Sequence, residues 1–192
     1  MGELKSAYER ALEKAEKLGA LSPQELREKK DAEQSAIGRA LAERYLEHGY
    51  PRTLVEGLER YHGDDRDVVA KGALSRLVAE IDFDNGQATD RALKGIEGLS
   101  AAAKGLQAAE EIRSLVGRYR DAERQAREQA RERVYALGGQ LLDELGIGGS
   151  AIAEVRLGAG AVWEETSTEL RTRFEGRLGK LKQQLLAPSD ES

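Results

Sequence analysis

The chain has 192 residues, of which 40% are apolar, 34% are charged and only 5% are aromatic. Its formal net charge of −5 does not favour nucleic-acid binding by bulk electrostatic attraction. It contains no cysteine, which excludes disulfides and thiolate metal sites, and no apolar run approaches the ~20 residues of a membrane span. We therefore expect a helical, cytoplasmic protein that makes no membrane contact.

Apolar residues recur every three or four positions along most of the chain, and this spacing predicts amphipathic helices. Ser22-Pro23-Gln24-Glu25 combines a capping box with proline at the first helical position, so it predicts a helix that runs from there to Gly49. The second half of that helix is expected to present three apolar side chains to a core: Ile37, Leu41 and Tyr45. Other short helices are predicted over residues 4–18, 51–62 and 64–81.

Residues 82–86 predict a turn that follows these short helices. Its Asn85-Gly86 pair tolerates positive φ, and we expect that conformation here. Asp64 or Asp65 is expected to cap the helix before the turn. The turn is the predicted boundary of a first domain, an N-terminal helical cluster over residues 1–86.

Residues 87–186 predict a long helical hairpin, with a break near Gly98 and a long helix from about Ala101 to Leu145. A glycine-rich connecting loop over 146–160 would let a last helix over 162–186 fold back, and a disordered tail would occupy 187–192. The predicted fold class is all-α, with the cluster of short helices followed by this long antiparallel hairpin, which resembles a coiled coil.

The two long helices carry apolar stripes that must be buried against a helix of the same chain, a second copy or another protein. The most economical function is a non-catalytic scaffold or adaptor that acts through helix–helix contacts, as a homodimer or with a protein partner. The candidate interaction residues lie on the two stripes and in the loop: Val134, Leu137, Leu141, Trp163, Phe174, Leu178, Gly148, Gly149 and Ser150.

An arginine-rich stretch from Arg118 to Arg133 offers an alternative function, a nucleic-acid- or ribosome-associated helical protein. Arg124, Arg127 and Arg131 are its candidate phosphate contacts. The stretch holds six arginines but also four acidic residues, which cancel much of its field, so a solvated helix surface is favoured over a nucleic-acid site.

The chain has few residues suited to metal binding or to nucleophilic catalysis. His48 and His62 are the only histidines, and Glu59 with His62 supplies one Glu-x-x-His motif where a carboxylate metal bundle needs two. The acidic segment at 82–86 lacks the ligand spacing of a calcium loop, and Gly148-Gly149-Ser150 lacks the lysine and strand of a phosphate loop. We predict no enzyme activity, no catalytic residue, no metal and no cofactor, and keep a metal-binding helical bundle as a further alternative.

The first residues provide a family resemblance. The segment Glu3-Leu4-Lys5-Ser6-Ala7, with Glu9, Ala11, Glu13 and Lys14 after it, resembles the start of small uncharacterised bacterial helical proteins known as domains of unknown function. The resemblance covers fewer than twenty residues of the chain. It implies a bacterial cytosolic context and no activity.

Overall fold

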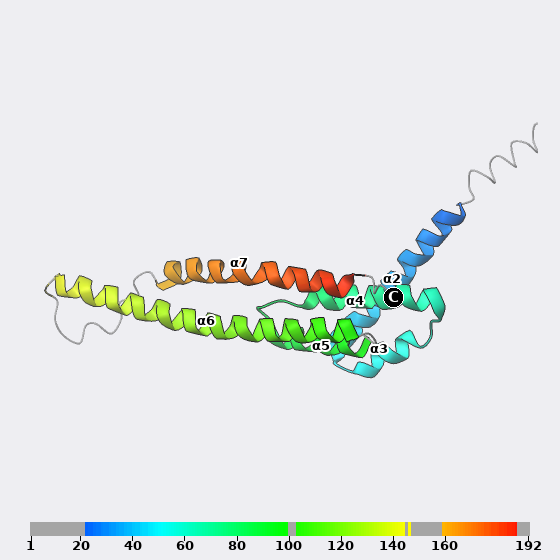
Figure 1. The fold of residues 1–192 in the computed structure, drawn as a ribbon, viewed down its shortest axis with the longest axis horizontal. Coiled ribbons are helices and arrows are strands. Elements are labelled where there is room, and N and C mark those ends of the chain that lie inside the picture. Colours follow the sequence, from blue (N-terminus) through cyan, green and yellow to red (C-terminus); the bar gives the residue numbers. More distant parts are fainter. Residues whose placement is uncertain (1–21, 100–102, 145, 147–158, 188–192) are drawn as a thin grey trace, which may run out of the picture.

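The computed structural model describes residues 22–99, 103–144, 146 and 159–187. Every regular element in this part of the chain is an α-helix, which confirms the all-α prediction. The helices are α2 (Pro23–His48), α3 (Pro51–Leu58), α4 (Gly63–Glu80), α5 (Gly86–Leu99), α6 (Ala103–Glu144) and α7 (Ala159–Leu186), as Figure 1 shows. The predicted helix over 4–18, most of the loop over 146–160 and all but the first residue of the tail over 187–192 lie outside the described residues.

Helix α2 begins and ends where its sequence predicts. The Ser22 hydroxyl accepts a hydrogen bond from the Glu25 amide at 3.2 Å, and the Glu25 carboxylate accepts one from the Ser22 amide at 2.7 Å. Gly49 ends the helix with a left-handed φ of 75°. The first turns of α2 are exposed and project from the rest of the molecule (Figure 1).

The buried face of α2 differs from the predicted one. Ile37 is 38% exposed, so the prediction that it faces the core is wrong, and Leu41 is only half-buried. Gly38 and Ala42 occupy the buried face, because their small size allows α4 to pack closely there. Tyr45 is buried as predicted, and its hydroxyl donates to the Arg91 carbonyl at 2.8 Å.

Two predicted local features around α4 are also corrected. The residue that precedes α4 as its N-cap is His62, so Asp64 and Asp65 lie within the first turn, where their charges favour the helix dipole. Asn85 does not adopt positive φ. Its side chain accepts a hydrogen bond from the Ala88 amide at 3.1 Å and so caps α5.

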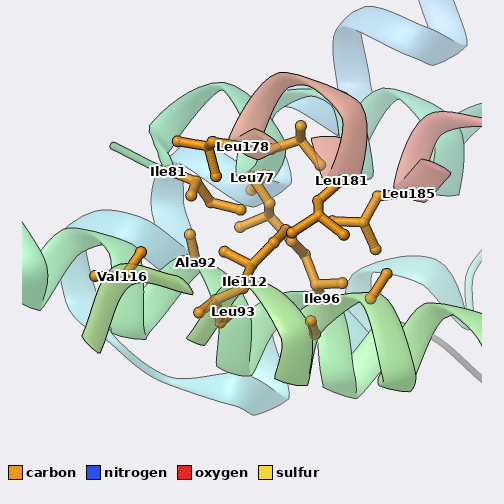
Figure 2. Close-up of a cluster of buried hydrophobic side chains, with 14 of the residues drawn as sticks. Leu77, Ile81, Ala92, Leu93, Ile96, Ile112, Val116, Leu178, Leu181 and Leu185 are labelled. Atoms are coloured by element: carbon orange, nitrogen blue, oxygen red, sulfur yellow. The ribbon is translucent and has the colours of Figure 1, made fainter. Parts of the chain in front are cut away.

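One hydrophobic cluster joins the helices. It contains side chains from α2, α3, α4, α5, the first half of α6 and the last half of α7. Figure 2 shows how leucines of α7, such as Leu178 and Leu181, meet Leu77 of α4 and Ile112 of α6. The cluster includes residues from both sides of the predicted boundary at residue 86, so the two stretches share this core. The boundary itself stays a prediction.

Helices α6 and α7 lie side by side, and α7 also contacts α4 (Figure 1). Tyr119 of α6 packs on Phe174 of α7, whereas Arg127 further along α6 packs on Trp163, which comes earlier in α7. The two helices therefore run in opposite directions.

Candidate interaction surface on helix α6

The first half of α6 is fixed by an aromatic cluster. The rings of Phe83 and Tyr119 stack with their centroids 4.2 Å apart, and Phe174 meets Tyr119 edge-on at 5.5 Å. Burial raises the pKa of the Tyr119 hydroxyl. The cluster joins the turn before α5 to both long helices, so this part of the α6 surface is already occupied.

An ion pair lies beside the aromatic cluster. The guanidinium of Arg171 donates to both carboxylate oxygens of Asp84, at 3.0 and 2.9 Å, and to Glu175 at 2.6 Å. Hydrogen bonds to Glu175 and then to Asp84 raise the pKa of Arg171. These contacts hold the turn at residues 82–85 against α7.

The middle of α6 is lined by alanines that face α7. Ala126 is half-buried, and Ala130 is buried. The guanidinium carbon of Arg127 lies 4.9 Å from the centroid of the Trp163 ring, an arrangement that allows a cation–π interaction. Trp163 lies near the start of α7, which begins at Ala159. Further along α6, Gly138 is still buried, whereas the residue before it is exposed.

The apolar face of α6 continues past this point. Leu137 follows Ala130 by seven residues, which is about two helical turns, and therefore lies on the same face. Ala130 is only 7% exposed, whereas Leu137 is 61% exposed and Val134 between them is half-buried. Figure 1 shows the yellow end of α6 extending beyond the first turn of α7. We call Ala130, Val134 and Leu137 the α6 end face.

Tyr135 is also exposed, at 63%, but it lies two residues from Leu137 and so points to another side of the helix. The Arg131 guanidinium lies 5.5 Å from the centroid of its ring. Hydrogen bonding to Tyr135 raises the pKa of Arg131. Tyr135 is therefore a natural comparison residue for Leu137, with similar exposure on the same helix.

The other predicted interaction residues have different environments. Leu178 is buried in the hydrophobic cluster, and Phe174 and Trp163 are half-buried against α6. The side chain of Leu141 and the residues Gly148, Gly149 and Ser150 lie outside the described part of the structure. Of the predicted set, Leu137 is thus the described side chain most open to a partner.

The arginines proposed as phosphate contacts have acidic partners on their own helix. Arg124 lies 3.3 Å from Asp121, Arg127 lies 3.5 Å from Glu123, and Arg131 lies 4.0 Å from Glu128. Each carboxylate offsets the charge that its arginine would offer to a phosphate.

The histidines do not converge with other ligands. The side chain of His48 is 59% exposed and its nearest acidic partner, Glu47, is 3.9 Å away. Within the described ranges, no three His, Cys, Asp or Glu side chains are close enough to share a metal ion. No helix among the described residues is both long enough and apolar enough to cross a bilayer.

Sequence reasoning missed the role of Phe83 and Asp84. The sequence predicts only a turn at residues 82–86, yet Phe83 enters the aromatic cluster and Asp84 binds α7. The one available signal was an apolar residue within an otherwise polar turn, Asp82-Phe83-Asp84-Asn85.

Comparisons with protein-family models, with curated proteins and with solved structures give no match to this chain. The resemblance of residues 3–14 to bacterial helical proteins stays a prediction, and those residues lie outside the described part of the chain. The geometry of the α6 end face is therefore the basis for a functional proposal.

Proposed function

We propose that this chain is a non-catalytic helical scaffold or adaptor, and that it binds a partner helix with the α6 end face. The observation that carries the proposal is the exposure of Leu137, at 61%, on the helix face that is buried at Ala130. Burying a leucine side chain contributes about 1.5–3 kcal/mol, so the association of α6 with a helix that covers Leu137 would be favourable. A stripe that begins in an intrachain contact and continues into solvent is the pattern expected of a helix that recruits another helix.

In the proposed scaffold, α6 and α7 act together as a coiled-coil-like hairpin, and the cluster of residues 1–86 supports this hairpin at its base. The base of that hairpin is held by the aromatic cluster of Phe83, Tyr119 and Phe174, which supports a rigid presentation of the distal end. The proposed setting is the cytoplasm, where a surface leucine is available to other proteins.

Site-specific photo-cross-linking tests this proposal. A photoreactive amino acid replaces Leu137 in one variant and Tyr135 in a matched variant, and both are irradiated in the native cell. We expect a cross-linked protein adduct from position 137 and little or none from position 135. If position 137 gives no intermolecular adduct, or reacts only with residues of its own chain, the α6 end face is not a partner surface.

A further inference from the structure

Asn85 is the only asparagine in the chain, and a glycine follows it. We propose that Asn85-Gly86 is a site of spontaneous deamidation, which the fold holds back and which proceeds when the turn at residues 82–85 opens. The modified bond lies where this turn enters α5. The inference is independent of the α6 end face and of the proposed function.

The reaction needs only these two residues and water. The Gly86 backbone nitrogen attacks Cγ of Asn85, the bond from Cγ to the side-chain nitrogen breaks, and that nitrogen leaves as ammonia with the proton from the Gly86 amide. The product is a five-membered succinimide ring. One water then opens either carbonyl of the ring, which gives aspartate or isoaspartate. Glycine favours the attack, because it has no Cβ to obstruct the approach of its nitrogen.

Both reacting groups are accessible in the folded chain. Asn85 is exposed, so water reaches its side chain. Gly86 is the first residue of α5, and the first amides of a helix have no intrahelical acceptor. The Gly86 amide donates no hydrogen bond to another described residue. Burial therefore does not protect this site, and any protection must come from the conformation of the turn.

Three hydrogen bonds hold Asn85 in a conformation that opposes ring closure. Its amide donates to Oδ1 of Asp82 at 2.7 Å, its own Oδ1 accepts from the Ala88 amide at 3.1 Å, and its carbonyl accepts from the Thr89 amide at 3.0 Å. To bring the Gly86 nitrogen onto Cγ, the side chain and the following peptide plane of Asn85 must both rotate. That rotation breaks the hydrogen bonds from Ala88 and Thr89.

The rest of the turn is anchored as well. The fully buried Thr89 hydroxyl donates to the Asp82 carbonyl at 2.8 Å and accepts from the Asp82 amide at 3.1 Å. The Phe83 ring stacks in the aromatic cluster, and Asp84 is ion-paired to α7. Asn85 therefore cannot rotate freely while these contacts persist, so deamidation requires a local opening of the turn.

The two products should affect the turn differently. Aspartate keeps a side-chain oxygen at the same place and caps a helix as well as asparagine does. Isoaspartate routes the main chain through the former side chain, which lengthens the backbone by one atom and removes the acceptor for the Ala88 amide. Isoaspartate at position 85 should therefore loosen the connection between the turn and α5.

Peptide mass spectrometry of the full chain, incubated at mildly alkaline pH, tests the proposal. Deamidation at Asn85 should be at least about tenfold slower in native buffer than in urea, because only the open turn reacts. Asp82→Ala should raise the native rate by about fivefold, since one hydrogen bond to Asn85 is lost. Asp90→Ala removes the same charge from an exposed position in α5 and should leave the rate within about twofold.

In urea, all three chains should react at the same rate, and circular dichroism verifies that each native sample is helical. A chain that does not deamidate at Asn85 in urea would overturn the proposal. Equal rates in native buffer and in urea would also overturn it, as would an Asp82→Ala variant that reacts no faster than Asp90→Ala in native buffer.

Hydrogen exchange tests the structural consequence. In the isoaspartate form, separated by chromatography, the Ala88 and Thr89 amides should exchange about tenfold faster than in the unmodified chain. The Asn85→Asp variant carries the same charge on a normal backbone and should exchange like the unmodified chain. If the isoaspartate form and Asn85→Asp exchange alike at these two amides, the inferred loosening of the turn is wrong.

Discussion

Gly38 of α2 and Gly72 of α4 mark the closest approach of these two helices. A Cβ atom on Gly38 would lie 2.0 Å from the carbonyl oxygen of Val69, and one on Gly72 would lie 2.3 Å from the carbonyl oxygen of Ser35. Both obstacles are backbone atoms, which cannot rotate away as a side chain can. The packing of α2 on α4 therefore requires glycine at both positions.

Gly38→Ala and Gly72→Ala should each lower the free energy of unfolding by about 2 kcal/mol, because the helices must separate to admit the methyl group. This loss exceeds the ~1 kcal/mol that alanine contributes through its higher helix propensity. Urea denaturation followed by circular dichroism measures both variants. Gly176→Ala is the control, since a Cβ there meets only open space, and it should stabilise the chain by about 0.5–1 kcal/mol. Equal stability of the Gly38→Ala and Gly176→Ala variants would contradict the close approach.

Phe174 should be essential for holding α7 to the rest of the protein. Its ring meets Tyr119 at 5.5 Å and Phe83 at 6.2 Å, both edge-on. Phe174→Ala should cost about 3 kcal/mol of unfolding free energy, through lost burial and lost aromatic contacts. Leu26→Ala, at a side chain that is 54% exposed, should cost less than about 0.5 kcal/mol. A Phe174→Ala variant as stable as Leu26→Ala would show that the aromatic cluster does not stabilise this junction.

The contact between Arg127 and Trp163 can be followed by fluorescence, because Trp163 is the only tryptophan. Arg127→Ala should shift its emission to longer wavelength, since the ring loses the guanidinium that covers it. The loss of about 0.5–1 kcal/mol should lower Tm by about 2–3 °C. Arg124→Ala, whose side chain is 80% exposed, should change neither quantity. An unshifted emission maximum in Arg127→Ala would argue against the stacked arrangement.

The Glu25 carboxylate in the capping box of α2 should take up a proton in acid, at a pH below the usual range of a glutamate. Hydrogen bonds from the backbone and side chain of Ser22 lower the pKa of Glu25 from its usual 4.5. Between this lowered pKa and 4.5, the unfolded chain therefore binds more protons than the folded chain. The contribution of Glu25 to folding stability is present above pH 4.5 and is lost as the pH falls through the lowered folded pKa.

NMR titration of the Glu25 side chain measures this effect. Ser22→Ala should move the pKa back towards 4.5 and increase fraying of the first turn, whereas Ser22→Thr should preserve the low value. A pKa that is unchanged by Ser22→Ala would mean that the cap does not form.

Local signals predicted the parts of the fold that depend on neighbouring residues. The capping box at Ser22 and the stop at Gly49 are both present, because each is made by contacts within a few residues. The predicted buried face of α2 is wrong at Ile37. Which face is buried depends on how α4 packs, and the spacing of apolar residues within α2 does not carry that information. A stripe of Gly38 and Ala42 is less apolar than one through Ile37, yet it permits closer packing.

The contact between Asp84 and Arg171 shows the same limit over a longer range. These residues are 87 positions apart, and no spacing rule connects them. Leu137 was a candidate from its helical spacing alone. Its exposure depends on how far α7 extends along α6, which only the three-dimensional arrangement shows.

Photo-cross-linking from positions 137 and 135 in the native cell tests most directly the claim that a partner covers the α6 end face. Position 137, where the leucine is 61% exposed, should give an intermolecular adduct that position 135 does not give. No intermolecular adduct from position 137, or equal adducts from both positions, would contradict the account.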